Sequence, residues 1–171
     1  TMHYAMENGY LDHYLTNEKL ESLVIHDQLT GVFNRNIFKK IADSDTEEFT
    51  ICEGLPISIV MIDLDYFKKI NDKFGHEAGD IVLKYAANTL KTSVRSSDYV
   101  IRWGGEEFIV ILPGCDMKKA LEIAEKIRVN IESGESTICP VTASIGVAEY
   151  TSGSYHDVIE CADVALYRAK K

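Results

Sequence analysis

The segment "DYVIRWGGEEFIVIL", residues 98–112, contains two runs of strand-forming residues separated by a pair of glycines. Aromatic and β-branched residues favour strands, and a glycine turn between two such runs predicts an antiparallel hairpin. The same turn sets Glu106 and Glu107 side by side, where like charges repel each other. We therefore expect an ordered hairpin tip to need a compensating positive charge.

Strands and helices alternate around this hairpin. The β-branched run "ISIVMID", residues 57–63, is typical of a buried strand, and "VTASIGVAEY", residues 141–150, predicts a last strand. Between these strands, residues 66–72 predict a short helical turn and residues 73–80 a loop. Three helices are predicted, at 80–93, 116–133 and 154–171. The order indicates an α+β fold with a ferredoxin-like βαββαβ core, in which helices cover one face of a mainly antiparallel sheet.

The beginning of the chain differs from this core. Residues 1–25 predict a helical linker or stalk, which is either an ordinary packing helix or a dimerising segment, and residues 26–171 predict the domain proper. Asn34 is the expected N-cap of a helix that follows it. Residues 43–56 are acidic and irregular, which predicts a surface loop.

The composition restricts the partners. The 171 residues suit one globular domain, and the formal net charge of −9 disfavours a nucleic-acid polymer or an anionic membrane as partner. An anionic small molecule could still bind through metal ions. The four cysteines form no metal-binding pattern and suggest reduced, mostly buried thiols of a cytosolic protein. No apolar run is long enough to cross a bilayer.

Carboxylates follow the first predicted strand as well as the glycine turn. Asp63 and Asp65 end the segment "VMIDLD", and in a βαββαβ sheet this strand neighbours the hairpin that contains Glu106. Converging carboxylate oxygens suit Mg²⁺ or Mn²⁺, which would also remove the repulsion at the turn. Acidic residues at strand ends are also commonly solvated or cap helices, so these residues alone leave both interpretations open.

An amide and a further carboxylate, Asn71 and Asp80, lie on either side of the predicted loop that contains Gly75 and Gly79. Asp80 could accept hydrogen bonds from the N1–H and exocyclic amine of guanine, and Asn71 could pair with the remaining acceptors. Each residue also has an ordinary structural explanation. Asn71 could simply end a helix, and Asp80 could be the N-cap of the next one.

Five segments together resemble the GGDEF domain, the diguanylate cyclase family, in its GGEEF form. They occur in the family's order and span nearly everything after residue 25. They are "DQLTGVFNR" (27–35), "VMIDLDYFKKINDKFGHEAGD" (60–80), "RWGGEEF" (102–108), "VTASIGVA" (141–148) and "ADVALYRAK" (162–170). The resemblance implies a nucleotide-cyclase-like fold and a cytoplasmic domain, which could also be the cytoplasmic part of a larger, membrane-bound sensor.

The resemblance also implies a catalytic centre. Two Mg²⁺ or Mn²⁺ ions per active site would be held by Asp63, Glu106 and the backbone carbonyl of Leu64. Gly104 and Gly105 would let the main chain approach the nucleotide. Glu106 and Glu107 would assist removal of a proton from the attacking hydroxyl.

The substrate contacts implied by the resemblance are of two kinds. Guanine would be bound by Asn71 and Asp80 with His76 close by, although a loop histidine can equally make a structural hydrogen bond. The phosphates would be bound by the main chain at Phe67 and Lys68 and by the side chain of Lys170, which could alternatively be a solvated helix end.

The implied reaction condenses two GTP molecules into cyclic di-GMP (c-di-GMP) and two pyrophosphates. Each domain binds one GTP, so catalysis needs an antiparallel homodimer, and an N-terminal sensory or receiver domain would control it through the stalk. Arg95 and Asp98 resemble the family's RxxD product-inhibition site, although they could also form a salt bridge at a helix-to-strand turn. The alternative function is a non-catalytic module that binds c-di-GMP or GTP.

Overall fold

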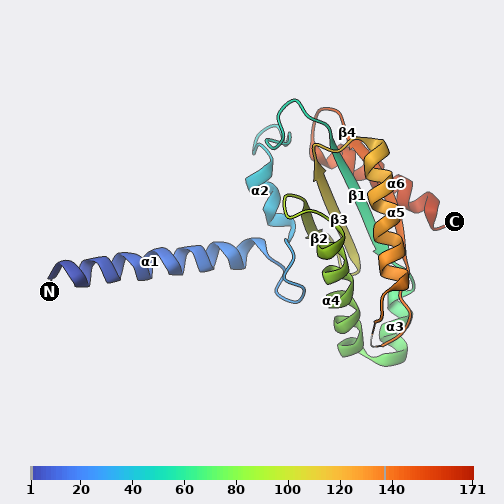
Figure 1. Ribbon diagram of the computed structural model, residues 1–171, viewed down its shortest axis with the longest axis horizontal. Helices are drawn as coiled ribbons and strands as arrows, with labels where there is room; N and C mark the ends of the chain where they lie inside the picture. Colours follow the sequence, from blue (N-terminus) through green and yellow to red (C-terminus); the bar gives the residue numbers. More distant parts are fainter. Residues whose placement is uncertain (1, 137) are drawn as a thin grey trace.

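Four antiparallel strands form the centre of the computed structural model, which describes residues 2–136 and 138–171, with only the backbone for residues 2–8 and 21–23. The strands lie in the order β2-β3-β1-β4 (Figure 1). Their bounds are β1 (Ile57–Leu64), β2 (Tyr99–Arg102), β3 (Glu107–Pro113) and β4 (Ala143–Tyr150). In this order β3 lies between β1 and β2, and β1 lies between β3 and β4, so the predicted ferredoxin-like α+β fold is confirmed.

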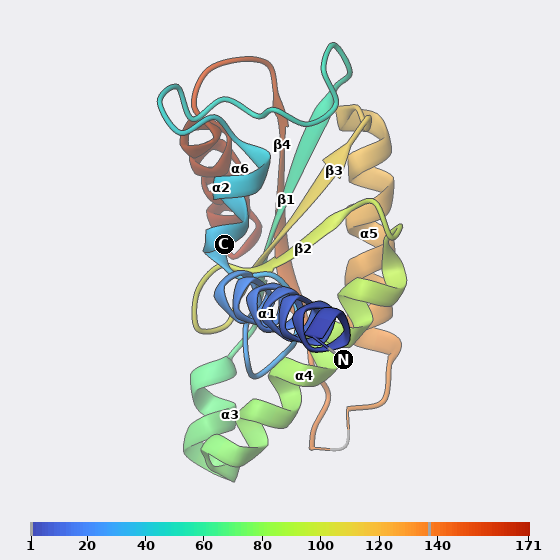
Figure 2. The same ribbon diagram turned by 90° about the vertical axis from the view of Figure 1, so that its left-hand side faces the viewer.

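Helices cover both faces of the sheet (Figure 2). The helical elements are α1 (Met2–Ile25), η1 (Arg35–Ile37), α2 (Phe38–Ile41), α3 (Phe67–Phe74), α4 (His76–Ser93), α5 (Met117–Ser133) and α6 (Tyr155–Ala169). Helices α4 and α5 pack on one face, and α2 and α6 on the other. The expectation of helices on one face alone was wrong, because every residue of β1 is buried and such a strand needs apolar cover on both sides.

The strand registers bring the predicted acidic residues to one end of the sheet. Asp63 of β1 pairs with Glu107 of β3 on one side and with Ser144 of β4 on the other. Met61 and Ile109 belong to the core on the α6 face, and side chains alternate along a strand. Asp63 and Glu107 therefore share the α6 face.

The predicted loop over residues 73–80 was wrong. Helix α4 begins at His76, and only Gly75, at a φ of 89°, separates it from α3. A glycine in this region of φ turns the chain without steric cost, so no longer loop is needed. Asp80 lies inside α4 rather than at its N-cap.

Other local expectations had mixed outcomes. Asn34 caps η1 as predicted, since its side-chain oxygen accepts a hydrogen bond from the amide of Asn36 at 2.8 Å. The predicted helix over residues 116–133 is present as α5, and its buried stripe consists of Ala120, Ala124, Ile127 and Ile131. All four cysteines are free, but of these only Cys115 is buried.

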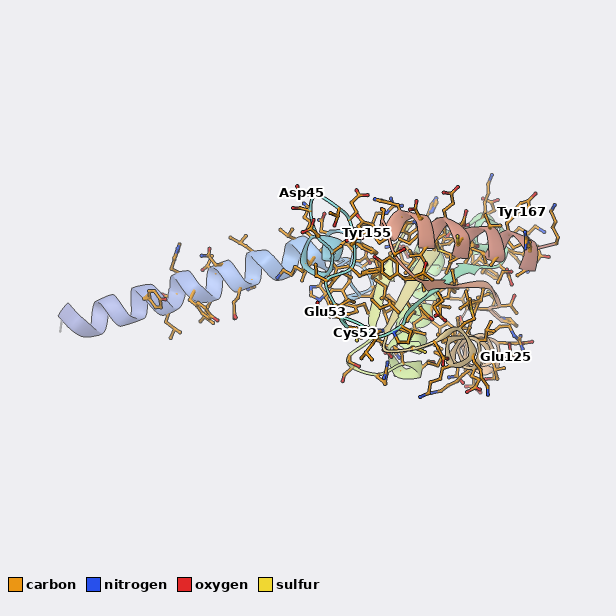
Figure 3. The ribbon with its side chains drawn as sticks, turned by 90° about the horizontal axis from the view of Figure 1, so that it is seen from above. Asp45, Cys52, Glu53, Glu125, Tyr155 and Tyr167 are labelled. Atoms are coloured by element: carbon orange, nitrogen blue, oxygen red, sulfur yellow. The ribbon has the colours of Figure 1, made fainter. Side chains whose placement is uncertain are left out.

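Helix α1 extends away from the rest of the chain, opposite the end of α6 that Tyr167 marks in Figure 3. Apolar side chains on its described part are exposed, namely Tyr10, Leu11, Tyr14, Leu15, Leu20 and Val24. Among the described helices, none combines the length and the hydrophobicity that crossing a bilayer requires. Thr1, in the predicted linker of residues 1–25, and Thr137, in the predicted domain of residues 26–171, lie outside the described residues.

Candidate active site

Acidic residues from β1 and the hairpin tip meet at one end of the sheet. Asp63 is directly opposite Glu107, and the Leu64 amide donates a hydrogen bond to the Glu106 carbonyl at 3.3 Å. Glu106 itself lies in the turn just before β3, and both glutamates are half-buried. The sequence predicted this convergence, but it did not predict that Glu107, rather than Glu106, would be the ladder partner of Asp63.

The environment of these carboxylates disfavours their negative charge. Burial raises the pKa of Glu107, and the negative charges of Asp63, Asp163 and Glu106 raise it further, while Lys170 opposes them. Asp63 is only 8% exposed. Its Oδ1 lies 2.8 Å from Lys170 Nζ, yet no hydrogen bond of good geometry reaches that oxygen from the described residues. The cluster therefore has more negative charge than its protein surroundings compensate.

This donor set fits a hard divalent cation. Carboxylate oxygens and a backbone carbonyl are ligands that Mg²⁺ and Mn²⁺ prefer, and the under-compensated Asp63 oxygen has capacity for one. Within the described residues, no three His, Cys, Asp or Glu side chains are grouped to hold an ion by themselves. The predicted set of Asp63, Glu106 and the Leu64 carbonyl does not require such a group, because one ligand is main chain.

The two glycines of the turn provide space rather than an unusual backbone. Neither Gly104 nor Gly105 is among the glycines with positive φ. The carboxylate of Glu107 occupies the space in which a Cβ of residue 104 would lie, and open space surrounds the corresponding position at residue 105. The turn thus has room beside the carboxylates for another group.

A second under-satisfied polar atom lies between α3 and α4. Asn71 Oδ1 is buried and has no hydrogen-bond partner among the described residues. It fills the space beside Gly79, where any Cβ would collide with it. Asp80 follows Gly79 on the same helix, and His76 begins that helix; both are exposed. The structure thus brings Asn71 against the helix that contains the other two predicted guanine contacts.

The start of α3 forms a further part of the site. Tyr66, at a φ of 55°, precedes the helix, so the amides of Phe67 and Lys68 lie in its first turn. The carboxylate of Asp65 accepts hydrogen bonds from Thr142 Oγ1 and Ser144 Oγ at 2.8 and 2.7 Å. A cavity of about 310 Å³ is lined by Asp65, Tyr66, Ser144, Ala169 and Lys170. Free amides at a helix N-terminus suit an anion such as a phosphate.

Contacts that the sequence did not predict hold the hairpin tip. Arg102 forms an ion pair with Asp27 at 3.2 Å and donates a hydrogen bond to the Gly105 carbonyl at 2.9 Å. On the other side, Arg35 donates to the Trp103 carbonyl at 2.6 Å and lies 4.0 Å above the Trp103 ring. We call the contacts of Arg102 with Asp27 and of Arg35 with Trp103 the clamp on the hairpin tip. The motif "DQLTGVFNR" contains both Asp27 and Arg35, so it was the sequence signal from which the clamp could have been predicted.

The RxxD residues lie elsewhere, between α4 and β2. Arg95 and Asp98 form an ion pair at 2.8 Å, and Asp98 also accepts from the Arg95 amide at 2.8 Å. The Arg95 guanidinium donates a further hydrogen bond to the Pro113 carbonyl at 3.0 Å. Cavities of about 430 and 320 Å³ flank the pair. The salt bridge considered from the sequence is therefore present.

A ferredoxin-like sheet with clustered carboxylates at one end and a helix N-terminus beside them defines a domain of nucleotide-cyclase-like fold. The family model described as "Diguanylate cyclase, GGDEF domain" matches residues 24–171. This chain belongs to that family.

Curated relatives are longer than this chain. The response regulator PleD of Caulobacter vibrioides NA1000 / CB15N is 41% identical over 169 residues, which cover 94% of this chain and 36% of the relative. The diguanylate cyclase DgcM of Escherichia coli K12 is 41% identical over 156 residues, covering 90% of this chain and 38% of the relative. This chain therefore spans little more than a third of either relative.

Solved structures agree with the fold. The coiled coil and GGDEF domain of DgcB from Caulobacter crescentus, in complex with c-di-GMP, superposes with a TM-score of 0.80 at 30% identity, covering 97% of this chain and 90% of that one. The active GGEEF domain of a diguanylate cyclase from Vibrio cholerae gives a TM-score of 0.64 at 33% identity, covering 68% and 77%.

Proposed function

We propose that this domain is a diguanylate cyclase, which condenses two GTP molecules into c-di-GMP and releases two pyrophosphates. Membership of the family and the relatives named diguanylate cyclase support this activity. The observation that carries the proposal is the buried Asp63 oxygen, which receives no hydrogen bond of good geometry from the described part of the chain and lies beside two glutamates. A carboxylate cluster of this kind is costly unless it binds something.

Asp63, the Leu64 carbonyl and Glu106 would hold two Mg²⁺ or Mn²⁺ ions. When bound, such ions offset phosphate charge and lower the pKa of a coordinated hydroxyl. Glu106, assisted by Glu107, would accept the proton of the attacking 3′-hydroxyl. The raised pKa of Glu107 suits it to this role, because a carboxylate with a higher pKa is a stronger base.

The residues around the cluster would bind and orient GTP. Asn71 and Asp80 would pair with the guanine edge, with His76 beside them, and the unpartnered Asn71 oxygen supports this role. A base without the matching donors would leave these groups unpaired and bind more weakly. The phosphates would contact the amides of Phe67 and Lys68, the main chain at Gly104 and Gly105, and the Lys170 side chain.

Catalysis would take place between two copies of the domain in antiparallel orientation, since each copy supplies one nucleotide. Residues 1–25 would act as a stalk that joins residues 26–171 to a sensory or receiver domain and sets the dimer geometry. The exposed apolar side chains of α1 support a contact with another helix. We place the domain in the cytoplasm, where GTP is available.

Arg95 and Asp98 would bind the product c-di-GMP and inhibit the enzyme. The exposed guanidinium of Arg95 and the two adjoining cavities support this assignment. Arg95→Ala should then relieve inhibition by added c-di-GMP while initial turnover without product continues.

Incubation with GTP and Mg²⁺, followed by chromatography, tests the proposal. We expect c-di-GMP and pyrophosphate in a 1:2 ratio, and dependence of the rate on protein concentration if dimerisation is required. Binding of c-di-GMP without any turnover, at concentrations at which the protein is dimeric, would instead support the non-catalytic module.

A further inference from the structure

Lys170 forms an ion pair with Asp63, a carboxylate of the proposed metal site. Its ammonium lies 2.8 Å from Asp63 Oδ1, and it opposes the effect of Asp63, Asp163 and Glu106 on the pKa of Glu107, while Asp65 lines the adjoining cavity with it. The Asp63 side chain is 11% exposed, whereas that of Lys170 is 40% exposed. A protein cation thus stands at the buried oxygen, and its own side chain remains accessible to solvent.

The packing of α6 fixes the backbone from which Lys170 extends. Gly146 of β4 lies against the backbone of Ala162 and Leu166, where a Cβ would collide with the helix. Gly146 also pairs with Met61, two residues before Asp63 on β1. The close contact therefore sets the end of α6 at a fixed distance from Asp63. The long Lys170 side chain has several rotatable bonds, so it can change its position while the helix stays in place.

Resting on the proposed function, we propose that Lys170 is an internal counter-ion that blocks the metal site until a nucleotide arrives. An ammonium and a divalent ion at the same carboxylate oxygen repel each other, so a free ion must displace Lys170 without offering it another anion. A nucleotide phosphate in the adjoining cavity, which Lys170 also lines, offers that anion.

The consequence is thermodynamic coupling. A phosphate that holds Lys170 away from Asp63 raises the affinity for the divalent ion, and by linkage the ion raises the affinity for the nucleotide. The metal ion and nucleotide should therefore bind together, with little binding of the ion alone. The Lys170 side chain exchanges one anionic partner for the other.

Binding of Mn²⁺ without nucleotide, measured from the electron paramagnetic resonance signal of free Mn²⁺, tests this coupling. We expect Lys170→Met to bind Mn²⁺ about tenfold more tightly than the unmodified protein. Lys170→Gln should act in the same direction, and Lys170→Arg, which keeps the charge, should bind as weakly as the unmodified protein. Lys171→Met is the matched control, because Lys171 contacts the Tyr167 ring instead of Asp63.

Calorimetric titration with the preformed complex of Mn²⁺ and 3′-deoxy-GTP, which lacks the attacking hydroxyl, separates the two proposals. We expect the unmodified protein to bind this complex and Lys170→Met to bind it more weakly. If the unmodified protein binds the complex but folded Lys170→Met and Lys170→Gln bind free Mn²⁺ no more tightly than Lys171→Met, the counter-ion role is wrong and the proposed function stands. If the unmodified protein does not bind the complex, both proposals are wrong.

Discussion

Two charged clusters of this domain differ in how well the protein itself satisfies them. Where β1 ends and β3 begins, Asp63 is buried with an oxygen that receives no hydrogen bond of good geometry from the described residues, and burial together with neighbouring carboxylates raises the pKa of Glu107. Between α4 and β2, Asp98 is also buried, and it accepts hydrogen bonds from the amide and the guanidinium of Arg95. Both clusters combine a buried carboxylate with a nearby cation, but of the two carboxylates only Asp98 is hydrogen-bonded by that neighbour.

The difference separates a charged cluster whose buried acid is hydrogen-bonded within the protein from one whose buried acid is not. Burying a polar atom without a partner costs free energy, so a fold retains such an atom where another requirement outweighs that cost. Asp63 Oδ1 has an ion pair with Lys170 but no hydrogen bond of good geometry, and Asn71 Oδ1 has no hydrogen-bond partner among the described residues; the Asn71 atom lies where guanine recognition is proposed. Substitutions in the two kinds of region should therefore affect different measurements.

The largest effect is expected from Glu106→Ala at the cluster around Asp63. Formation of c-di-GMP should fall on the order of 10³-fold, because the variant loses a proposed metal ligand and proton acceptor. Its thermal stability should not decrease, since one of several crowded carboxylates is removed. The control is Glu125→Ala on α5, whose partner is Arg128 at the surface (Figure 3). Equal rates for the two variants would contradict the assignment.

The next largest effect is expected from Asn71→Ala. The KM for GTP should rise about tenfold to a hundredfold, since hydrogen bonds to the base are lost. The free energy of unfolding should change little, because the side-chain oxygen has no hydrogen-bond partner among the residues that the structure describes. Asn130→Ala is the matched control: that amide donates to Ser93 Oγ at 2.9 Å, so stability should fall and KM should not change. A loss of stability in Asn71→Ala together with a raised KM in Asn130→Ala would contradict the distinction between the two sites.

At the cluster of Arg95 and Asp98, Asp98→Ala should lower stability. The variant removes hydrogen bonds from the Arg95 amide and guanidinium, which should cost about 1–3 kcal/mol in the free energy of unfolding. Urea denaturation measures the change. An unfolding free energy equal to that of the unmodified protein would show that the ion pair does not maintain the fold and would remove the contrast with Asp63.

The smallest effect is expected at the clamp on the hairpin tip. Burial raises the pKa of Asp27, but hydrogen bonds from Thr30 and the Arg102 guanidinium outweigh it, so the pKa lies below the ordinary value of 3.8. A carboxylate with a lowered pKa stabilises the fold above its unfolded pKa, and this contribution is lost as the pH falls. Asp27→Asn should cost about 1 kcal/mol at pH 7 and less near pH 3. A cost independent of pH, measured by urea denaturation, would contradict the role of its charge.

Much of the fold was predictable because periodicity and turn residues are local signals. The β-branched run before Asp63 and the hairpin around the twin glycines both appear as strands in the structure. Two features were missed for physical reasons. Gly75 makes a turn in one residue where a loop was expected, and α2 and α6 cover the second face of the sheet because β1 is apolar on both sides.

The residues of the candidate site were also predictable, but the hydrogen bonds and ion pairs that these residues form were not. The sequence indicated that Asp63 and the turn acids would converge, yet it contained no sign that Asp63 Oδ1 would lack a hydrogen bond or that Lys170 would stand beside it. These properties depend on side-chain contacts between α6 and β1. Likewise, the sequence left Arg95 and Asp98 as either a salt bridge or a ligand site, and the structure contains the salt bridge.

The most direct test of the central claim is a crystal structure of the protein with Mn²⁺ and 3′-deoxy-GTP, with the ions located by anomalous scattering. We predict Mn²⁺ bound by Asp63, Glu106 and the Leu64 carbonyl, and Lys170 directed to a phosphate. Nucleotide bound with no ion at these oxygens, and Lys170 still paired with Asp63, would contradict the account.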